Sequence, residues 1–207
     1  MSNKSKTLYI WDGGVFSPPT RAVGKLAFNM ATYLSSKFDN KYNIEYHFVP
    51  TNKYYNKPWV RCVEEDDRLH MLRNLVEFIN KNYNVPSNIK FIVNESEINY
   101  GKKHKESRTT IESLKYFSER QKQNVYVSGS IENIILLFSV NSIVFDTFSA
   151  ELIGVNQSED YVLKSINLSE LLKGANGEYP QQVNQYFKSN KISKKDVQNY
   201  IVSNKKE

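Results

Sequence analysis

The sequence predicts a doubly wound α/β domain with a parallel sheet, helices on both faces and a small helical C-terminal region. Up to residue 130, short β-rich runs alternate four times with helical patterns. Neighbouring parallel strands need a crossover connection, and a helix supplies it. The 207 residues, 40% of them hydrophobic, are enough for one buried core, and there is no internal repeat. We expect a single domain over 1–207, with its core at about 6–150 and the helical region at about 160–203.

The first strand and helix lie near the N-terminus. Residues 7–11 form a short β-rich run that ends at an Asp-Gly-Gly sequence. After Pro-Pro-Thr, apolar residues recur at helical spacing, with Leu26, Met30 and Leu34 on one face. This order predicts strand, loop and helix.

The second strand and helix follow the same order. Ile44, Tyr46 and Phe48 alternate with polar residues, which indicates a strand that ends at Pro50. A helix should open at Asp66 or Asp67, and the acidic residues 64–67 are typical of its N-terminal cap, because negative charge there interacts favourably with the helix dipole. The helix that follows has apolar residues at helical spacing, namely Leu69, Leu72, Leu75, Val76 and Ile79.

The rest of the chain completes a Rossmann-like order. Residues 89–93 predict a third strand, and 99–108 a polar, basic loop near the carboxyl ends of the strands. A helix at about 110–120 and a strand at 125–127, which ends in Ser-Gly-Ser, come next. The remaining expected elements are a helix at about 132–138, a strand at 142–145, and short helices at 168–173, 179–189 and 193–202.

Charge and composition limit the classes of protein. With 28 Lys and Arg against 22 Asp and Glu, the net charge is +6, which favours an anionic partner: a nucleic acid, a nucleotide or a membrane surface. The 14 Tyr and 11 Phe argue against wholesale disorder. The single cysteine, Cys62, excludes an internal disulfide, and no apolar stretch is long enough for a signal peptide or a membrane span. We therefore expect a cytoplasmic protein without membrane contact.

The loop after the first strand is the first candidate for function, because ligands of parallel α/β sheets bind at the carboxyl ends of the strands. Residues 13–20 read GGVFSPPT. Two glycines allow close approach of the backbone to a ligand, and the helix that follows offers free N–H groups to an anion. Such a loop suits a phosphate, although the same dipeptides also make an ordinary turn.

Six segments resemble, in order, the motifs of one enzyme superfamily. They are GVFSPPT at 14–20, Pro50 with YYNK at 54–57, RLHM at 68–71, TIESL at 110–114, VSGS at 127–130 and INLSELL at 166–172. In this order they resemble the nucleotidyltransferases that include nicotinamide and nicotinate mononucleotide adenylyltransferases, with their motifs G-x-F-x-P-x-T/H, Arg-x-x-Met, Thr-x-x-Thr-Leu, Gly-x-Asp and Ile-Ser-x-Thr-x-Ile-Arg. The resemblance covers most of the chain.

The resemblance implies a function in NAD biosynthesis. The expected reaction transfers an adenylyl group from ATP, with Mg²⁺, to a mononucleotide and releases pyrophosphate. Members of the superfamily are often oligomeric, so a homo-oligomer is a further expectation. By resemblance, the nucleotide-binding residues would be Gly13, Gly14, Phe16, Thr20, Lys25, Lys57, Gly129 and Ser169.

The chain departs from the family at charged positions. Val23 stands where the family has a phosphate-binding histidine, Leu172 where it has arginine, and Ile131 where it has an acidic residue. The aromatic residue that stacks on the nicotinamide ring corresponds to Ser107 or Thr109. Lysine can neutralise phosphate as a point charge, without the guanidinium fork. The candidate replacements are Arg21, Lys25, Lys57 and Lys173, of which Lys25 and Lys173 are the candidate catalytic residues.

These departures leave a second interpretation open. A catalytically degenerate relative that acts as a nucleotide-binding or interaction protein would tolerate the loss of the family's histidine and arginine. Metal ligation by protein side chains is not expected, because His47, His70 and His104 have no ligand spacing. A serine hydrolase is not expected either, because Ser128 and Ser130 lack a G-x-S-x-G nucleophile elbow and a paired base. Nucleic-acid binding by the basic stretch at 100–108 is the weakest alternative, since no recognition motif accompanies it.

Overall fold

The computed structural model describes residues 6–55, 60, 62–122, 125–130, 151–155 and 163–167. The chain divides into two compact units, Met1–Ser128 and Gly129–Glu207. The expectation of one domain over 1–207 stays a prediction.

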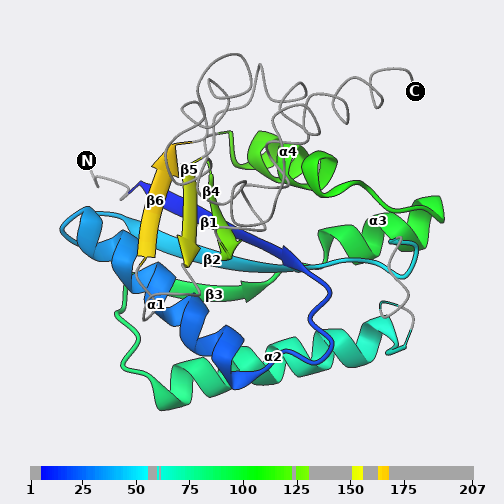
Figure 1. The fold of residues 1–207 in the computed structure, drawn as a ribbon, viewed down its shortest axis with the longest axis horizontal. Coiled ribbons are helices and arrows are strands. Elements are labelled where there is room, and N and C mark those ends of the chain that lie inside the picture. The colour runs from blue at the N-terminus through cyan, green and yellow to red at the C-terminus, as the bar shows by residue number, and fades with distance from the viewer. Residues whose placement is uncertain are drawn as a thin grey trace, which may run out of the picture. The chain divides into compact units, whose positions relative to one another are not determined.

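Four parallel strands form a sheet in the order β3-β2-β1-β4 (Figure 1). This confirms the predicted α/β class. Strand β1 lies inside this sheet, and the chain moves outward from it in one direction through β2 to β3, then returns on its other side as β4. The strands are β1 (Thr7–Gly14), β2 (Asn43–Pro50), β3 (Ile89–Val93) and β4 (Tyr126–Ser130). The helices are α1 (Arg21–Lys37), α2 (Glu65–Asn82), α3 (Ser96–His104) and α4 (Thr110–Gln121).

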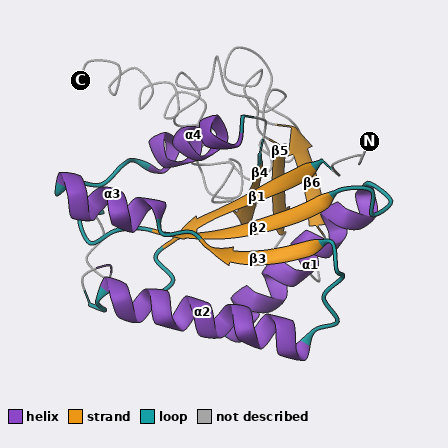
Figure 2. Cartoon of the chain, turned by 180° about the vertical axis from the view of Figure 1, so that it is seen from behind, coloured by secondary structure: helices purple, strands orange, loops and turns teal. Residues whose placement is uncertain are grey.

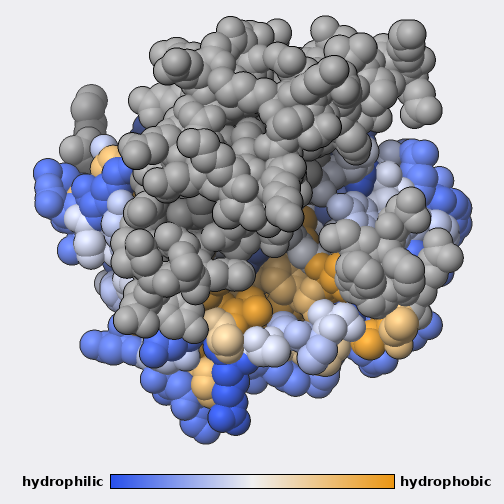
Figure 3. All heavy atoms as spheres, viewed as in Figure 1, coloured by the Kyte–Doolittle hydropathy of each residue, from blue (hydrophilic) through white to orange (hydrophobic). Residues whose placement is uncertain are grey.

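Helices cover both faces of the sheet, as Figure 2 shows from the far side. Side chains alternate between the two faces along a strand. On one face Ser128 of β4 contacts Met30 of α1, and on the other Tyr9 and His47 pack their rings edge-on against Phe117 of α4. On the surface seen in Figure 3, hydrophilic residues dominate the outer sides of the helices, and apolar residues gather toward the sheet.

Helix α1 packs on α2 by way of a glycine. A Cβ atom on Gly24 would lie 2.9 Å from Leu75 Cδ1 and 3.2 Å from Ile79 Cγ1, so only glycine allows this approach without a shift. The predicted apolar faces are largely confirmed: Met30 and Leu34 are fully buried, as are Leu72 and Ile79. Two members are only half-buried, namely Leu26 in α1 and Val76 in α2.

The prediction of a loop at 99–108 is wrong over 99–104, which belong to helix α3. Within the helix, Ile98 is fully buried and Gly101 packs on Asn52, where a Cβ would lie 2.5 Å from Cγ. Basic side chains of its last turn suit the negative end of the helix dipole. Lys105, at φ 62°, then ends the helix in the left-handed region.

Strand β1 extends beyond its predicted end and includes both glycines of the predicted loop. A Cβ on Gly13 would lie 2.1 Å from the indole of Trp11, which packs back along the strand. Gly13 therefore has a packing role independent of any ligand. Strand β4 likewise continues through Gly129 to Ser130.

The second unit contains strands β5 (Glu151–Val155) and β6 (Leu163–Asn167), which pair antiparallel with Ile153 opposite Ser165. Neither strand is predicted from the sequence. The helices expected at 132–138, 168–173, 179–189 and 193–202 and the strand at 142–145 lie outside the described residues. None of the described helices combines the length and the hydropathy that crossing a bilayer requires.

Candidate functional site

The strand order places a topological switch point between β1 and β4. These two strands pair in parallel, with Ile10 opposite Tyr126 and Trp11 opposite Val127, and their connections leave toward opposite sides. In open α/β sheets the crevice outside the carboxyl ends at such a point is the usual ligand site. The loop from β1 to α1 begins there, which agrees with the location expected from the sequence.

The β1–α1 loop folds back onto the end of the sheet. Phe16 has φ 51°, a left-handed conformation that few non-glycine residues adopt. Its ring packs edge-on against Phe48 of β2, with the ring centroids 5.8 Å apart, and lies over Gly14, where a Cβ would be 3.2 Å away. Ser17 precedes Pro18 through a cis peptide bond. Phe16 and Gly14 thus shape the loop together.

Helix α1 starts at the end of this loop with a threonine cap. Thr20 Oγ1 accepts a hydrogen bond of 3.5 Å from the backbone N–H of Val23, and the first turn carries no acidic residue. Lys25 is exposed one turn further on. The guanidinium of Arg21 lies 5.2 Å from the ring centroid of Phe78 in α2, so Arg21 is engaged by the neighbouring helix.

A buried arginine joins the first two loops at the carboxyl edge. Arg68 of α2 is 0% exposed, and its Nη1 donates to the carbonyl oxygen of Val15 at 3.1 Å and to that of Thr51 at 2.8 Å. Its Nε and Nη2, together with Thr51 Oγ1, are buried and have no hydrogen-bond partner in the described part of the chain. Burial lowers the pKa of Arg68, and the nearby carboxylates of Glu65 and Glu64 raise it.

Three hydroxyl and carboxyl groups meet beside the switch point. The Tyr46 hydroxyl donates to Asp12 Oδ2 at 2.7 Å, and it lies 2.6 Å from Ser128 Oγ. Tyr46 is fully buried and Ser128 is 6% exposed. The three residues lie on adjacent strands, β2, β1 and β4, and on the sheet face that Met30 of α1 covers. They form a continuous hydrogen-bonded line across the sheet.

Burial gives this line an unusual acid. Loss of solvation raises the pKa of Asp12 to about 7, against the opposing effect of the hydrogen bond from Tyr46. The pKa of Tyr46 rises well above its usual value, first through burial and then through the charge of Asp12. Asp12 can therefore take up or release a proton near neutral pH, while Tyr46 stays protonated.

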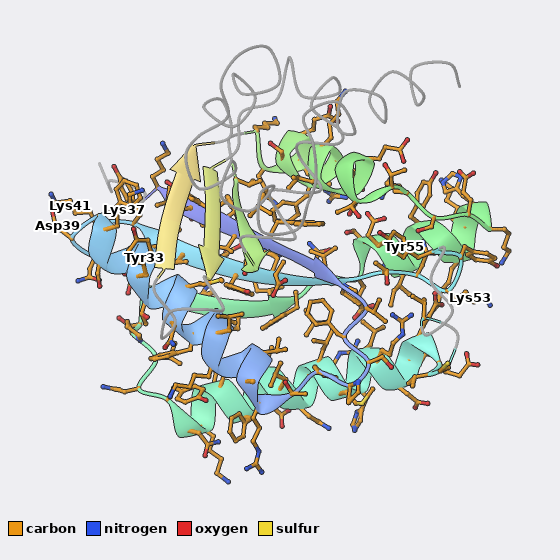
Figure 4. All side chains as sticks on the ribbon, in the orientation of Figure 1. Tyr33, Lys37, Asp39, Lys41, Lys53 and Tyr55 are labelled. Carbon is orange, nitrogen blue, oxygen red and sulfur yellow. The ribbon has the colours of Figure 1, made fainter. Side chains whose placement is uncertain are left out.

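The loop after β2 is held by a buried amide. Asn52, which is 0% exposed, donates from Nδ2 to the carbonyl oxygens of Glu97 at 2.9 Å and Glu106 at 3.2 Å. Further along, the hydroxyl of Tyr55 lies 2.9 Å from that of Thr110 at the start of α4. Figure 4 shows Lys53 and Tyr55 at this edge, far from Lys37 and Lys41 at the opposite end of the sheet. Contacts with α3, with the segment that follows it and with α4 thus fix the loop.

The acidic residues 64–67 stabilise the α2 N-terminus in a different way from a side-chain cap. Glu64 occupies the cap position but makes no capping hydrogen bond, so that detail of the prediction is wrong. Glu65, Asp66 and Asp67 lie in the first turn, where their charge suits the dipole. Glu65 is also buried, and its Oε1 accepts a 2.7 Å hydrogen bond from the backbone N–H of Lys53.

Intramolecular contacts engage much of the basic stretch. The Arg108 guanidinium lies between two rings, 3.8 Å from the centroid of Tyr100 and 3.9 Å from that of Tyr116, and donates to Glu97 Oε1 at 2.9 Å. Lys102 pairs with Asp66 at 3.3 Å. These contacts neutralise charge that would otherwise face an external anion.

The remaining predicted residues divide into those the structure describes and those it does not. His47 lies on β2, with a pKa that burial lowers and Glu45 raises, while His70 and His104 lie on different helices. Across the described ranges, no group of three His, Cys, Asp or Glu side chains suits a metal ion. Gly129 lies in β4. The predicted residues outside the described ranges are Lys57, Ile131, Ser169, Leu172 and Lys173.

Sequence reasoning missed the two polar clusters. The segment RLHM predicts a motif helix but no role for Arg68, although an arginine amid apolar helix positions is a signal for a buried anchor. Asp12 carries a weaker signal, since it interrupts an apolar strand face, and Tyr46 carries none. Only the register of β1 and β2 brings them together.

Comparison with known proteins adds no relative, since neither a protein-family model nor a curated protein sequence matches the chain.

Proposed function

We propose that this protein is a nucleotidyltransferase-like enzyme that transfers an adenylyl group from ATP to a mononucleotide similar to nicotinamide or nicotinate mononucleotide. The observation that carries the proposal is the position of the GVFSPPT loop. It leaves β1 at the switch point and leads directly into the N-terminus of α1, whose first turn holds no acidic side chain. Helix N-termini at such points bind phosphate groups.

The packing of the loop supports the proposal further. Phe16 and Gly14 hold the loop against Phe48, and Arg68 binds its Val15 carbonyl, so the loop is preorganised for a ligand. In this scheme the free N–H groups at the start of α1 and the exposed Lys25 meet phosphate oxygens. By resemblance, Lys57 would join this set.

Adenylyl transfer requires little covalent catalysis by the protein. Adenylyl transfer depends on positioning the acceptor phosphate in line with the α-phosphate and on neutralising charge as pyrophosphate leaves. Mg²⁺ would enter with ATP and neutralise part of that charge. Asp12 lies in β1, immediately before the two glycines with which the strand ends.

The direct test is incubation of the purified protein with ATP, Mg²⁺ and either mononucleotide, followed by measurement of dinucleotide and pyrophosphate. Both products should appear in equal amounts, and Lys25→Ala should lower kcat/KM by about tenfold through loss of one charged contact. Lys41→Ala is the matched control, because Lys41 lies at the opposite end of the sheet. Equal activity of Lys25→Ala and the wild type would remove Lys25 from the site.

A second candidate function has its own observation. Val23 stands at the histidine position, and Arg21, which could replace the lost charge, is engaged with Phe78. A protein that binds the nucleotide without turning it over would tolerate both features. ATP binding in calorimetry without pyrophosphate release would favour this binding protein over the enzyme.

A further inference from the structure

Within the described part of the chain, one side of the Arg68 guanidinium makes hydrogen bonds and the other side makes none. Nη1 donates to two loop carbonyls, whereas Nε and Nη2 are buried without a partner in the described part of the chain. Nε and Nη2 point their N–H bonds the same way, and this pair of donors fits two oxygens of a carboxylate or phosphate. The unused side is therefore a complete fork for an anion.

One further unsatisfied group, the hydroxyl of Thr51, belongs to a residue that binds Arg68 at the carboxyl ends of the first two strands. Thr51 directly follows β2, and its backbone N–H donates to the Gly14 carbonyl at 2.9 Å, which continues the ladder between β1 and β2. The Thr51 carbonyl binds Arg68 Nη1, while its Oγ1 is buried without a partner across the described residues. Three polar atoms without partners among the described residues thus belong to Arg68 and Thr51, which a hydrogen bond joins.

Leaving these atoms unpaired is costly. A buried donor without an acceptor destabilises the folded state, and more so when it carries charge. No carboxylate of the described residues forms an ion pair with Arg68, although Glu65 and Glu64 are near enough to raise its pKa. Glu65 uses one oxygen on the Lys53 N–H. Among the described residues, the positive charge consequently lacks a direct counterion.

We propose that Arg68 and Thr51 form an internal anion site that takes a phosphate group, held by the Nε–Nη2 fork and the Thr51 hydroxyl. The site requires a tetrahedral anion with two oxygens for the fork and a third for the hydroxyl. The phosphate can be the free ion or part of a nucleotide. The guanidinium is fully enclosed, so the anion enters only when part of its cover moves aside.

This site is independent of the proposed adenylyl transfer. It uses neither Lys25 nor the N-terminus of α1, and it predicts phosphate binding whether or not the protein turns ATP over. Loss of turnover with intact phosphate binding would contradict the proposed function alone. Loss of phosphate binding with intact turnover would contradict this site alone.

The experiment measures the thermal unfolding midpoint of the full chain over a range of inorganic phosphate, with chloride at matched ionic strength as reference. A ligand that binds only the folded state raises the midpoint with concentration. We expect phosphate to raise it more than chloride. Thr51→Val should weaken the apparent phosphate affinity about tenfold through loss of one hydrogen bond, and Arg68→Lys about a hundredfold through loss of the fork.

Two controls separate binding from structural effects. Thr32→Val removes a hydroxyl that is already satisfied by the Phe28 and Asn29 carbonyls, so it should leave the phosphate response unchanged. Thr51→Val should by itself raise the midpoint without phosphate, because it removes an unpaired buried hydroxyl. If Arg68→Lys does not fold, the Thr51→Val comparison and the Arg68 Nε–H resonance of the wild type, which phosphate should shift, still test the site.

The outcomes are distinct. A phosphate response in the wild type that falls in Thr51→Val supports the site, and an ATP response with the same dependence on Thr51 identifies the occupant as a nucleotide phosphate. A response to free phosphate but not to ATP identifies the free ion. A phosphate response no larger than that of chloride, or one equal in wild type and Thr51→Val, overturns the proposal.

Discussion

The two ends of the parallel sheet differ in how far the hydrogen bonds of their polar side chains are satisfied. At the amino end, polar side chains are paired: Asn88 Nδ2 donates to the Tyr42 carbonyl at 2.9 Å and to Ser35 Oγ at 2.8 Å, and Ser35 donates to Asn40. At the carboxyl end, Arg68 and Thr51 keep buried polar atoms without partners in the described part of the chain, and burial shifts the pKa of Asp12.

The difference shows at which end of the sheet the fold accepts destabilising polar groups. Unsatisfied and desolvated polar groups destabilise a protein, and they are concentrated at functional sites more than elsewhere. Here they lie at the edge where parallel α/β proteins bind ligands. At the amino end, in contrast, the hydrogen bonds of Asn88 and Ser35 are satisfied within the chain.

Removal of the buried arginine should have the largest effect on this comparison. Arg68→Met leaves the Val15 and Thr51 carbonyls without their donor and releases both loops. We expect a loss of about 3 kcal/mol in the free energy of unfolding, measured by urea denaturation. A loss below about 1 kcal/mol would show that Arg68 does not hold the carboxyl edge together.

The acid at the end of β1 should make stability depend on pH. The pKa of Asp12 is about 7 in the folded protein, above the ordinary value of about 4 that applies when unfolded. The folded state therefore binds the extra proton, so the stabilisation is complete below about pH 4 and is lost as the pH rises through 7. Between pH 6 and 8 the wild type should lose about 1.4 kcal/mol relative to Asp12→Asn.

The comparison with Asp12→Asn cancels the titration of other groups, including His47, whose pKa burial lowers. Tyr46 does not titrate in this range, because its pKa lies well above the usual value. Denaturation curves at pH 6, 7 and 8 measure the difference. A constant difference across that range would mean that Asp12 is ionised throughout and that its carboxylate is better solvated than the structure indicates.

The sequence predicts the parallel sheet because strand and helix periodicity are local, and Ile44, Tyr46 and Phe48 show it plainly. It cannot predict α3 in the same way, since that helix depends on Ile98 and on Gly101 packing against Asn52, 49 positions earlier in the chain. The Arg68 contacts are equally non-local: they span 53 residues to Val15 and 17 to Thr51. The place of the candidate site is therefore predictable, but its buried partners are not.

The N-terminal cap of α4 lies at the carboxyl end of the sheet and is exposed. It tests whether the stability lost on substitution depends on burial or on position in the fold. At the start of α4, Thr109 Oγ1 accepts a hydrogen bond from the Glu112 N–H at 3.2 Å, and Glu112 Oε2 accepts one from the Thr109 N–H at 2.7 Å. Both groups are exposed. Thr109→Ala should cost about 1 kcal/mol in urea denaturation, less than Arg68→Met. An equal loss of stability in Thr109→Ala and Arg68→Met would mean that position at the carboxyl end, and not burial, determines the loss.

The smallest effect is expected at the amino end, from the ion pair between Lys41 and Asp39. The two charged groups are 3.2 Å apart, but their side chains are 71% and 79% exposed. Water and salt screen such pairs, so Asp39→Asn should change the free energy of unfolding by less than about 0.5 kcal/mol. Asparagine also tolerates the φ of 51° at this position, so the substitution adds no backbone strain. A loss above about 1 kcal/mol, or one that grows at low salt, would show that the amino end also depends on electrostatics, and the contrast between the two ends of the sheet would then rest on Arg68 alone.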